Sequence, residues 1–266
     1  MSLPDLAPPP LPALSSVPEA AVAPRPPRTL YFVGTAIFAL IVYGVQNLIG
    51  IVALTVLLFV HGVGPDTPRA ELMALMKQGG WMAFAMIAAA PFTIATLWVA
   101  IRIVRQPFSD YLALVRPRGA EIAKALALTA GLMLFWLVVG YLRGEAVPAF
   151  DIEIYRTAKD AGQLAILVIA LCLAAPISEE FFFRGFLFRG WSQSFLGPVG
   201  AIVLSSAVWA AIHTQYNVLY ITEIFTIGLL FGYFRYRSGS TWLTMIAHGC
   251  VNLVSIVEVA LIVAYP

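Results

Sequence analysis

The chain has 266 residues, of which 61% are hydrophobic and 11% charged, and its mean hydropathy is +0.88. Soluble globular domains carry about 25% charged residues, so this composition excludes a water-soluble fold and predicts an all-α, polytopic bundle of transmembrane helices. At about 20 residues per span, the length allows about seven spans in one domain. The net charge of +2, without a basic cluster interleaved with aromatic residues, predicts no nucleic-acid partner.

Residues 1–29 are rich in Pro and Ala and have no apolar period, which predicts a disordered cytoplasmic tail. No apolar segment follows a basic start early in the chain, so a cleavable signal peptide is not expected. The transmembrane helical domain is expected to cover residues 30–266. Its region 160–260 carries the residues discussed below.

Seven apolar runs follow one another along the chain: 30–60, 81–101, 122–142, 164–175, 199–213, 218–236 and 241–264. The polar segment between the first two runs and the segment 143–160 are predicted loops. Pro91 is expected to kink the second run. The fourth run is too short to span a bilayer alone, so we expect its helix to continue through Pro176 and beyond.

The distribution of Lys and Arg predicts the orientation, because cytoplasmic loops carry an excess of these residues. Eleven fall on the side of the N-terminus: Arg25, Arg28, Arg102, Arg105, Arg116, Arg118, Lys124, Arg184, Arg189, Arg235 and Arg237. Five fall on the other side: Arg69, Lys77, Arg143, Arg156 and Lys159. The two groups sum to the 16 in the chain and predict a multi-pass protein of the plasma (inner) membrane with a cytoplasmic N-terminus.

Two adjacent acids in the fourth run are the first candidate functional residues. Each ionisable residue inserted in a membrane costs about 2.5–3.5 kcal/mol. Glu180 and Arg184 are four residues apart and can form an ion pair on one helix face. Glu179 lies about 100° round the helix, so it can point elsewhere. The alternative is that both acids only pair with Arg184 and Arg189 at the cytoplasmic interface.

Two histidines in later apolar runs are the next candidates. His213 lies near the end of the fifth run, and His248 shares a helix face with Asn252 four residues later. A histidine in an apolar helix is often a hydrogen-bonding partner between helices, and a His-Asn pair can hold helices together. Their occurrence together with Glu179, at similar expected depth, favours a common site.

A carboxylate and two imidazoles in a dry cavity can perform chemistry. The carboxylate can activate water as a general base, while the imidazoles position that water or bind an oxyanion. The same three groups could instead hold Zn²⁺ with an open coordination position. The sequence has no HExxH motif, which excludes a zincin arrangement. We expect no cofactor, with zinc as the alternative.

Three motifs occur in order in the last third of the chain: Glu179-Glu180-xxx-Arg184, Trp209-xxx-His213 and His248-xxx-Asn252. This set resembles the CAAX-prenyl-protease and bacteriocin-processing membrane proteases, the CPBP or Rce1-like intramembrane endopeptidases. The resemblance covers about residues 160–260. It implies an all-helical membrane fold and an endopeptidase that cuts a peptide bond near the cytoplasmic membrane face.

The resemblance also implies roles for the motif residues. Glu179 would act as the base on the attacking water, aided by His213. His248 and Asn252 would stabilise the oxyanion, without metal. Glu180 and Arg184 would be supporting residues. One departure is that the second motif usually opens with Phe where this chain has Trp209, so we expect altered packing without loss of catalysis.

The implied partners are membrane lipid and a peptide or lipidated protein substrate, in CAAX-type or peptide-maturation processing. Two alternatives come from other classes. One is a non-catalytic membrane scaffold or immunity protein of the same fold, which has no need to keep all the motif residues. The other is a small transporter that uses Glu179 as a proton relay, which would not explain the His-xxx-Asn motif.

Overall fold

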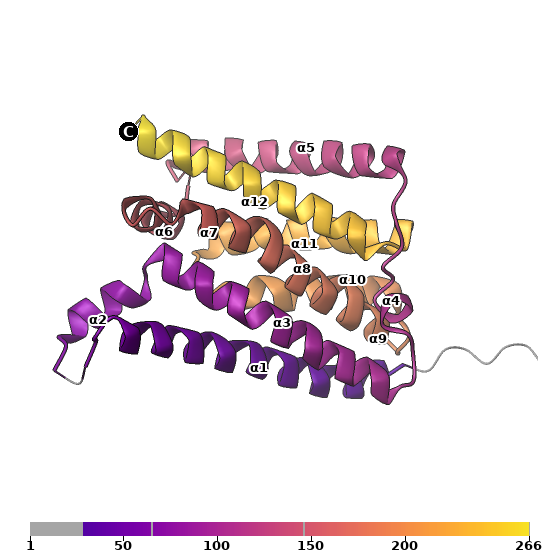
Figure 1. Cartoon of the computed structure of the whole chain (residues 1–266). Coiled ribbons are helices and arrows are strands. Elements are labelled where there is room, and N and C mark those ends of the chain that lie inside the picture. Colours follow the sequence, from indigo (N-terminus) through magenta and orange to yellow (C-terminus); the bar gives the residue numbers. More distant parts are fainter. Residues whose placement is uncertain (1–28, 65, 146, 266) are drawn as a thin grey trace, which may run out of the picture.

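The computed structural model describes residues 29–64, 66–145 and 147–265. The predicted N-terminal tail therefore lies almost entirely outside the described residues. The described part of the chain is helical and contains no strand. Its long helices lie side by side in one bundle (Figure 1).

Among the described residues, six helical segments are long and apolar enough to cross a membrane: α1 (Tyr31–Val60), α3 (Gly79–Ile103), α5 (Gly119–Arg143), the continuous segment Leu164–Ser192, α11 (Val218–Ser238) and α12 (Thr241–Ala264). A shorter apolar helix, α10 (Gly197–Ala211), completes the set. These elements match the seven predicted runs, so the prediction of an all-helical multi-pass membrane protein is confirmed. Helix α3 continues through Pro91 without a break.

The fourth run continues far beyond Ala175, as predicted. Its segments are α7 (Leu164–Ile169), η1 (Ala170–Ala174), α8 (Ala175–Glu180), η2 (Phe181–Leu187) and α9 (Phe188–Ser192). The two η segments are π-helical, a wider winding that leaves the regular hydrogen-bond ladder. Pro176 follows η1 and has no amide hydrogen to donate. At Gly190 a side chain would collide with Thr35 of α1, so this glycine allows the two helices to approach closely.

Two predicted loops are wrong, because short helices form in them: α2 (Arg69–Met76) and α6 (Ala149–Asp160). Helix α6 begins after Pro148 and has Asp151 in its first turn and Lys159 in its last, which suits the helix dipole. Its residues Ile154 and Ala158 are four apart and are buried against Ala83, Leu167 and Ala170. The segment is too polar overall to resemble a span, but one face is apolar enough to pack.

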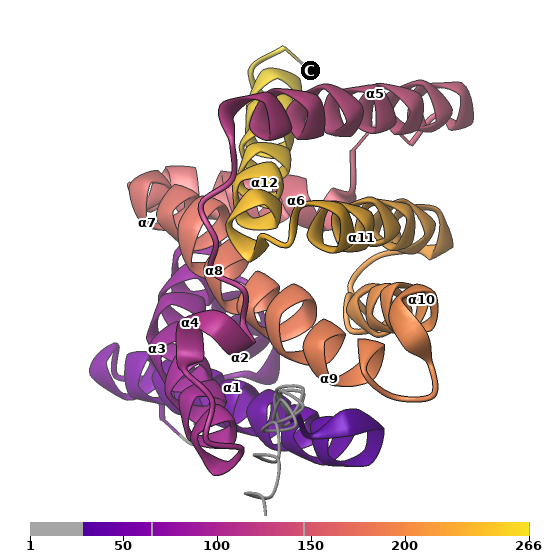
Figure 2. The same ribbon diagram turned by 90° about the vertical axis from the view of Figure 1, so that its right-hand side faces the viewer.

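The bundle has two distinct ends. Helices α2 and α6 and the C-terminus lie at one end, called here the α6 end; the short helix α4 (Phe108–Tyr111) and α9 lie at the other, the α4 end (Figure 1). Helix α5 lies at the edge of the bundle and packs on α11 and α12 (Figure 2). The largest apolar core gathers around η2 and includes Phe183, Phe186 and Leu187.

Candidate active site

A cavity of about 1040 Å³ lies between α3, α5, α6, α11, α12 and the Leu164–Ser192 segment. Glu179, His213, His248 and Asn252 all line it, together with Trp209. The four residues singled out from the sequence come from three separate parts of the chain. The fold therefore brings them to the surface of the same space.

Glu180 and Arg184 form the ion pair that their spacing predicted. Arg184 Nη1 lies 2.8 Å from Glu180 Oε1, and the two side chains are 1% and 0% exposed. The Arg184 guanidinium also lies over the Trp209 ring, 4.4 Å from its centroid, and donates to the carbonyl of Gly228. A buried pair of this kind is destabilising to break, because removal of one partner leaves an uncompensated charge.

His248 joins this buried pair. Its Nδ1 lies 2.9 Å from Glu180 Oε1, so the Glu180 carboxylate binds both Arg184 and His248. Because an ionised carboxylate can only accept, Nδ1 carries the proton and Nε2 is the other nitrogen of the ring. The sequence did not predict this contact, since the two residues are 68 positions apart.

Glu179 has a different environment from its neighbour. Its Oε2 accepts a hydrogen bond of 2.6 Å from Trp209 Nε1, and its side chain lines the cavity. The Phe that usually opens the second motif could not donate this bond. Trp209 therefore changes more than packing, because it orients the Glu179 carboxylate. The two adjacent acids thus have separate partners, as their positions about 100° apart on a helix allow.

His213 does not lie inside a span. Helix α10 ends at Ala211, so His213 occupies the turn that follows, which corrects the predicted run 199–213. Its Nδ1 donates to the Trp209 carbonyl over 2.7 Å. Because a carbonyl only accepts, Nδ1 is protonated, and Nε2 of the neutral ring is an acceptor. The ring stacks on Tyr216 with a centroid distance of 6.2 Å and an interplanar angle of 11°.

Asn252 uses one of its amide hydrogens within the fold. Its Nδ2 donates to the carbonyl of Leu171 over 2.6 Å. Leu171 belongs to the π-helical segment η1, where a carbonyl can lose its usual helical partner. Asn252 therefore ties α12 to the widened turn, and its second amide hydrogen remains for other contacts.

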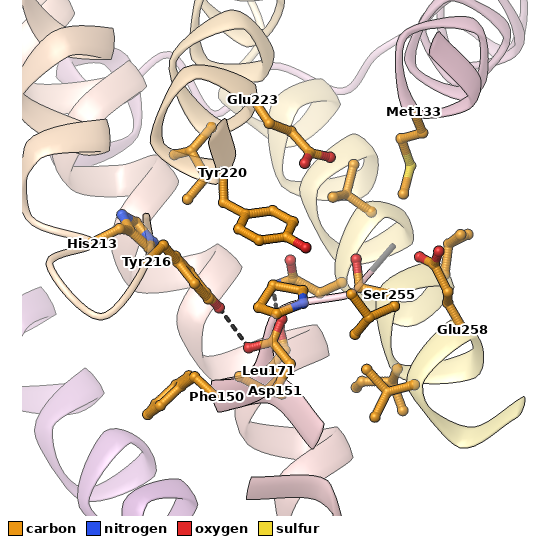
Figure 3. A pocket seen from close by; sticks show the side chains of 18 of the residues that line it. Met133, Phe150, Asp151, Leu171, His213, Tyr216, Tyr220, Glu223, Ser255 and Glu258 are labelled. Atoms are coloured by element: carbon orange, nitrogen blue, oxygen red, sulfur yellow. Dashed lines mark hydrogen bonds between the residues drawn. The ribbon is translucent and has the colours of Figure 1, made fainter. Parts of the chain in front are cut away.

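Several polar residues of the cavity were given no role by the sequence reasoning. Tyr216 donates to Asp151 Oδ1 over 2.7 Å, and Glu223 and Glu258 lie nearby on the cavity wall (Figure 3). Burial raises the pKa of Asp151 to about 6, although the bond from Tyr216 and the nearby His213 oppose this shift. Burial and the neighbouring Asp151 also raise the pKa of Tyr216. The sequence signal that could have revealed Asp151 is the amphipathic pattern that follows Pro148.

Metal ligation was the sequence-based alternative for Glu179 and the two histidines. Across the part of the chain that the structure describes, no group of three or more His, Cys, Asp or Glu side chains lies close enough to hold a metal ion. The absence of zinc stays a prediction, which elemental analysis can test.

Comparison with known proteins shows what the region around these residues resembles. The family model described as "Type II CAAX prenyl endopeptidase Rce1-like" matches residues 161–254, a range that contains Glu179, His213, His248 and Asn252. The predicted resemblance is confirmed over residues 161–254, where the chain is similar to this family. An Escherichia coli protein, described as an uncharacterized 24.3 kDa protein, is 29% identical over 115 residues, which are 41% of this chain and 52% of the relative. The chain thus spans about half the length of that curated relative. No solved structure matches.

Proposed function

We propose that this protein is an intramembrane endopeptidase that hydrolyses a peptide bond with water activated by Glu179. The observation that supports it most is that Glu179, His213, His248 and Asn252 all line one cavity within an Rce1-like region. A scaffold of the same fold has no requirement for these four side chains around one space.

Glu179 would act as the general base. Its carboxylate takes a proton from a water molecule as the water oxygen attacks the substrate carbonyl. His213, with its proton on Nδ1, offers Nε2 as an acceptor for the same water, so it orients the nucleophile. When the tetrahedral intermediate collapses, the C–N bond breaks and the Glu179 carboxyl returns its proton to the leaving nitrogen. The products are a carboxylic acid, which keeps the second proton of the water until it ionises, and an amine.

His248 and Asn252 would stabilise the oxyanion of the intermediate. Nδ1 of His248 donates to Glu180, so donation to the substrate from Nε2 would require a doubly protonated ring. Asn252 adds its second amide hydrogen. Donors fixed by the fold in this way are worth most where water is excluded.

Glu180 and Arg184 would position the other groups without touching the substrate. Arg184 holds Glu180, Glu180 holds His248, and the Arg184 guanidinium supports the face of Trp209. Trp209 in turn holds Glu179 through its indole N–H. One buried arginine therefore connects to both the proposed base and the proposed oxyanion donor.

The substrate would be a peptide or a lipidated protein held in the bilayer, in CAAX-type or peptide-maturation processing. The apolar walls of the cavity, which include Met133, Leu134, Leu137 and Val254, suit a lipid chain or an apolar peptide segment. We propose the plasma membrane as the location, with the N-terminus in the cytoplasm. Whether the bond is cut near the cytoplasmic face, as the sequence led us to expect, depends on which end of the bundle admits the substrate.

The deciding experiment is cleavage by the purified full-length protein. A prenylated peptide and a membrane-embedded peptide should be cut by the wild type and not by Glu179→Gln. A wild type that cuts no peptide, while it complements a deletion regardless of residue 179, would favour the scaffold.

A further inference from the structure

The cavity lies on one side of the proposed catalytic groups. Beyond Glu179, Trp209 and His248, its walls come from the α6 end of the bundle. They include α6 itself, the segment after α10 that carries Gln215 and Tyr216, the first turns of α11 and the last turns of α12. Figure 3 shows Asp151, Tyr216, Tyr220 and Glu258 around this part of the space. Gln215 is exposed, so the cavity reaches the surface there.

On the other side of Glu179, Trp209 and His248, at the α4 end, the bundle is closed by tightly packed side chains. Every residue of η2 is buried, including four phenylalanines, and Tyr111 and Leu112 of the α4 region are 1% and 0% exposed. Hydrogen bonds brace this end: Thr241 N donates to the Ala113 carbonyl and Ser240 Oγ to the Val115 carbonyl. A substrate would have to displace a close-packed core to reach Glu179 from here.

The orientation of the bundle decides which compartment meets the open end. Of the eleven Lys and Arg residues counted on the N-terminal side, Arg184 and Arg235 are buried and bind within the fold, Arg235 to the carbonyl of Arg184. Eleven minus two leaves nine, against five at the α6 end. The positive-inside rule still places the α4 end in the cytoplasm.

We propose that the cavity takes its substrate from the α6 end, and that this end faces away from the cytoplasm. The substrate class would then be a peptide segment displayed on the extracytoplasmic side of the membrane, cut by the groups of the proposed endopeptidase. This inference rests on the proposed function for the cleavage step, but the access route follows from packing and charge alone. It replaces the expectation of a cut at the cytoplasmic face, since that face meets the closed end.

Cysteine labelling tests the access route without cleavage. In a background with Cys172→Ala and Cys250→Ala, Ser255→Cys places a thiol on the cavity wall and Ser109→Cys places the same group on exposed α4. A charged maleimide crosses a bilayer poorly, so we expect Ser255→Cys to react at least about tenfold faster in intact spheroplasts than in inverted vesicles. Ser109→Cys should show the opposite ratio. If Ser255→Cys folds poorly, Gln215→Cys at the rim of the cavity takes its place.

The outcomes separate the access route from the chemistry. Labelling of both thiols from the same side would overturn the α6-end entrance, and labelling of the cavity thiol from the cytoplasm alone would overturn the extracytoplasmic substrate. Cleavage is then measured in proteoliposomes with the peptide on one side at a time. If both thiols are labelled as expected but no peptide is cleaved from either side, the proposed endopeptidase activity is refuted and the α6-end entrance stands. Cleavage only of peptide supplied on the α4 side would instead refute the α6-end entrance.

Discussion

Substitution of Glu179 by Gln removes the proposed base and preserves most of its surroundings. The carboxylate accepts a 2.6 Å hydrogen bond from Trp209 Nε1, and the amide oxygen of Gln can accept the same bond. A neutral amide is also less costly to bury than a carboxylate. We therefore expect Glu179→Gln to fold with nearly wild-type stability.

The rate of cleavage should fall much more than the stability. An amide cannot take the proton of the attacking water, and the loss of a positioned base typically lowers the rate by about 10²–10⁴. At about 1.36 kcal/mol per factor of ten, this corresponds to roughly 3–5 kcal/mol in the activation barrier. The effect should appear in kcat, because the base acts on water and does not bind the peptide.

Glu180→Gln is a matched control, with the same chemical change one residue further along. Here the lost charge is the partner of Arg184 at 2.8 Å and of His248 at 2.9 Å, and all three side chains are buried. Removal of one member of a buried pair costs about 3–5 kcal/mol because the other charge stays behind. This variant should lose thermal stability and yield, which Glu179→Gln should keep.

The assay requires both variants purified in detergent beside the wild type. Thermal unfolding gives the stability, and mass spectrometry of a prenylated or membrane-embedded peptide gives the rate. A folded Glu179→Gln protein that cleaves as fast as the wild type would refute the role of this carboxylate. Equal losses of stability in the two variants would refute the separate environments of the two acids.

Further predictions concern groups near the site. Trp209→Phe keeps the aromatic face over Arg184 but loses the N–H donor to Glu179, so the unfolding free energy should fall by about 1.5–3 kcal/mol while cleavage persists. The pKa of Asp151 is about 6 in the folded protein, above the value of about 3.9 in the unfolded chain. The folded state therefore binds the proton more tightly, and the free energy of unfolding should decrease as pH rises between these two values. Asp151→Asn should flatten this pH dependence in thermal unfolding scans. Elemental analysis of active protein should find no stoichiometric zinc, and one tightly held zinc per chain would replace the glutamate mechanism by a metal-assisted one.

Local spacing in the sequence predicted much of the fold and part of the site. Long apolar runs must be helical in a bilayer, because each backbone polar group needs a partner within its own segment. The four-residue spacing likewise predicted the Glu180–Arg184 pair. The bond between His248 and Glu180 and the bond between Tyr216 and Asp151 join residues 68 and 65 positions apart. Such contacts depend on how helices pack, and no local period encodes them.

The segment that contains Asp151 shows why the sequence contains no sign of the α6-end entrance that we propose. Sequence reasoning placed the candidate residues at similar depth and treated 143–160 as a loop, so nothing in it marked one end of the bundle as open. Helix α6 instead packs two apolar residues inward and turns Phe150 and Asp151 toward the cavity. Because α6 is amphipathic and short, it can form a wall at the membrane surface where a span cannot. The buried core at η2 closes the α4 end, and α6 forms a wall of the cavity at the other end, so the cavity extends toward the α6 end.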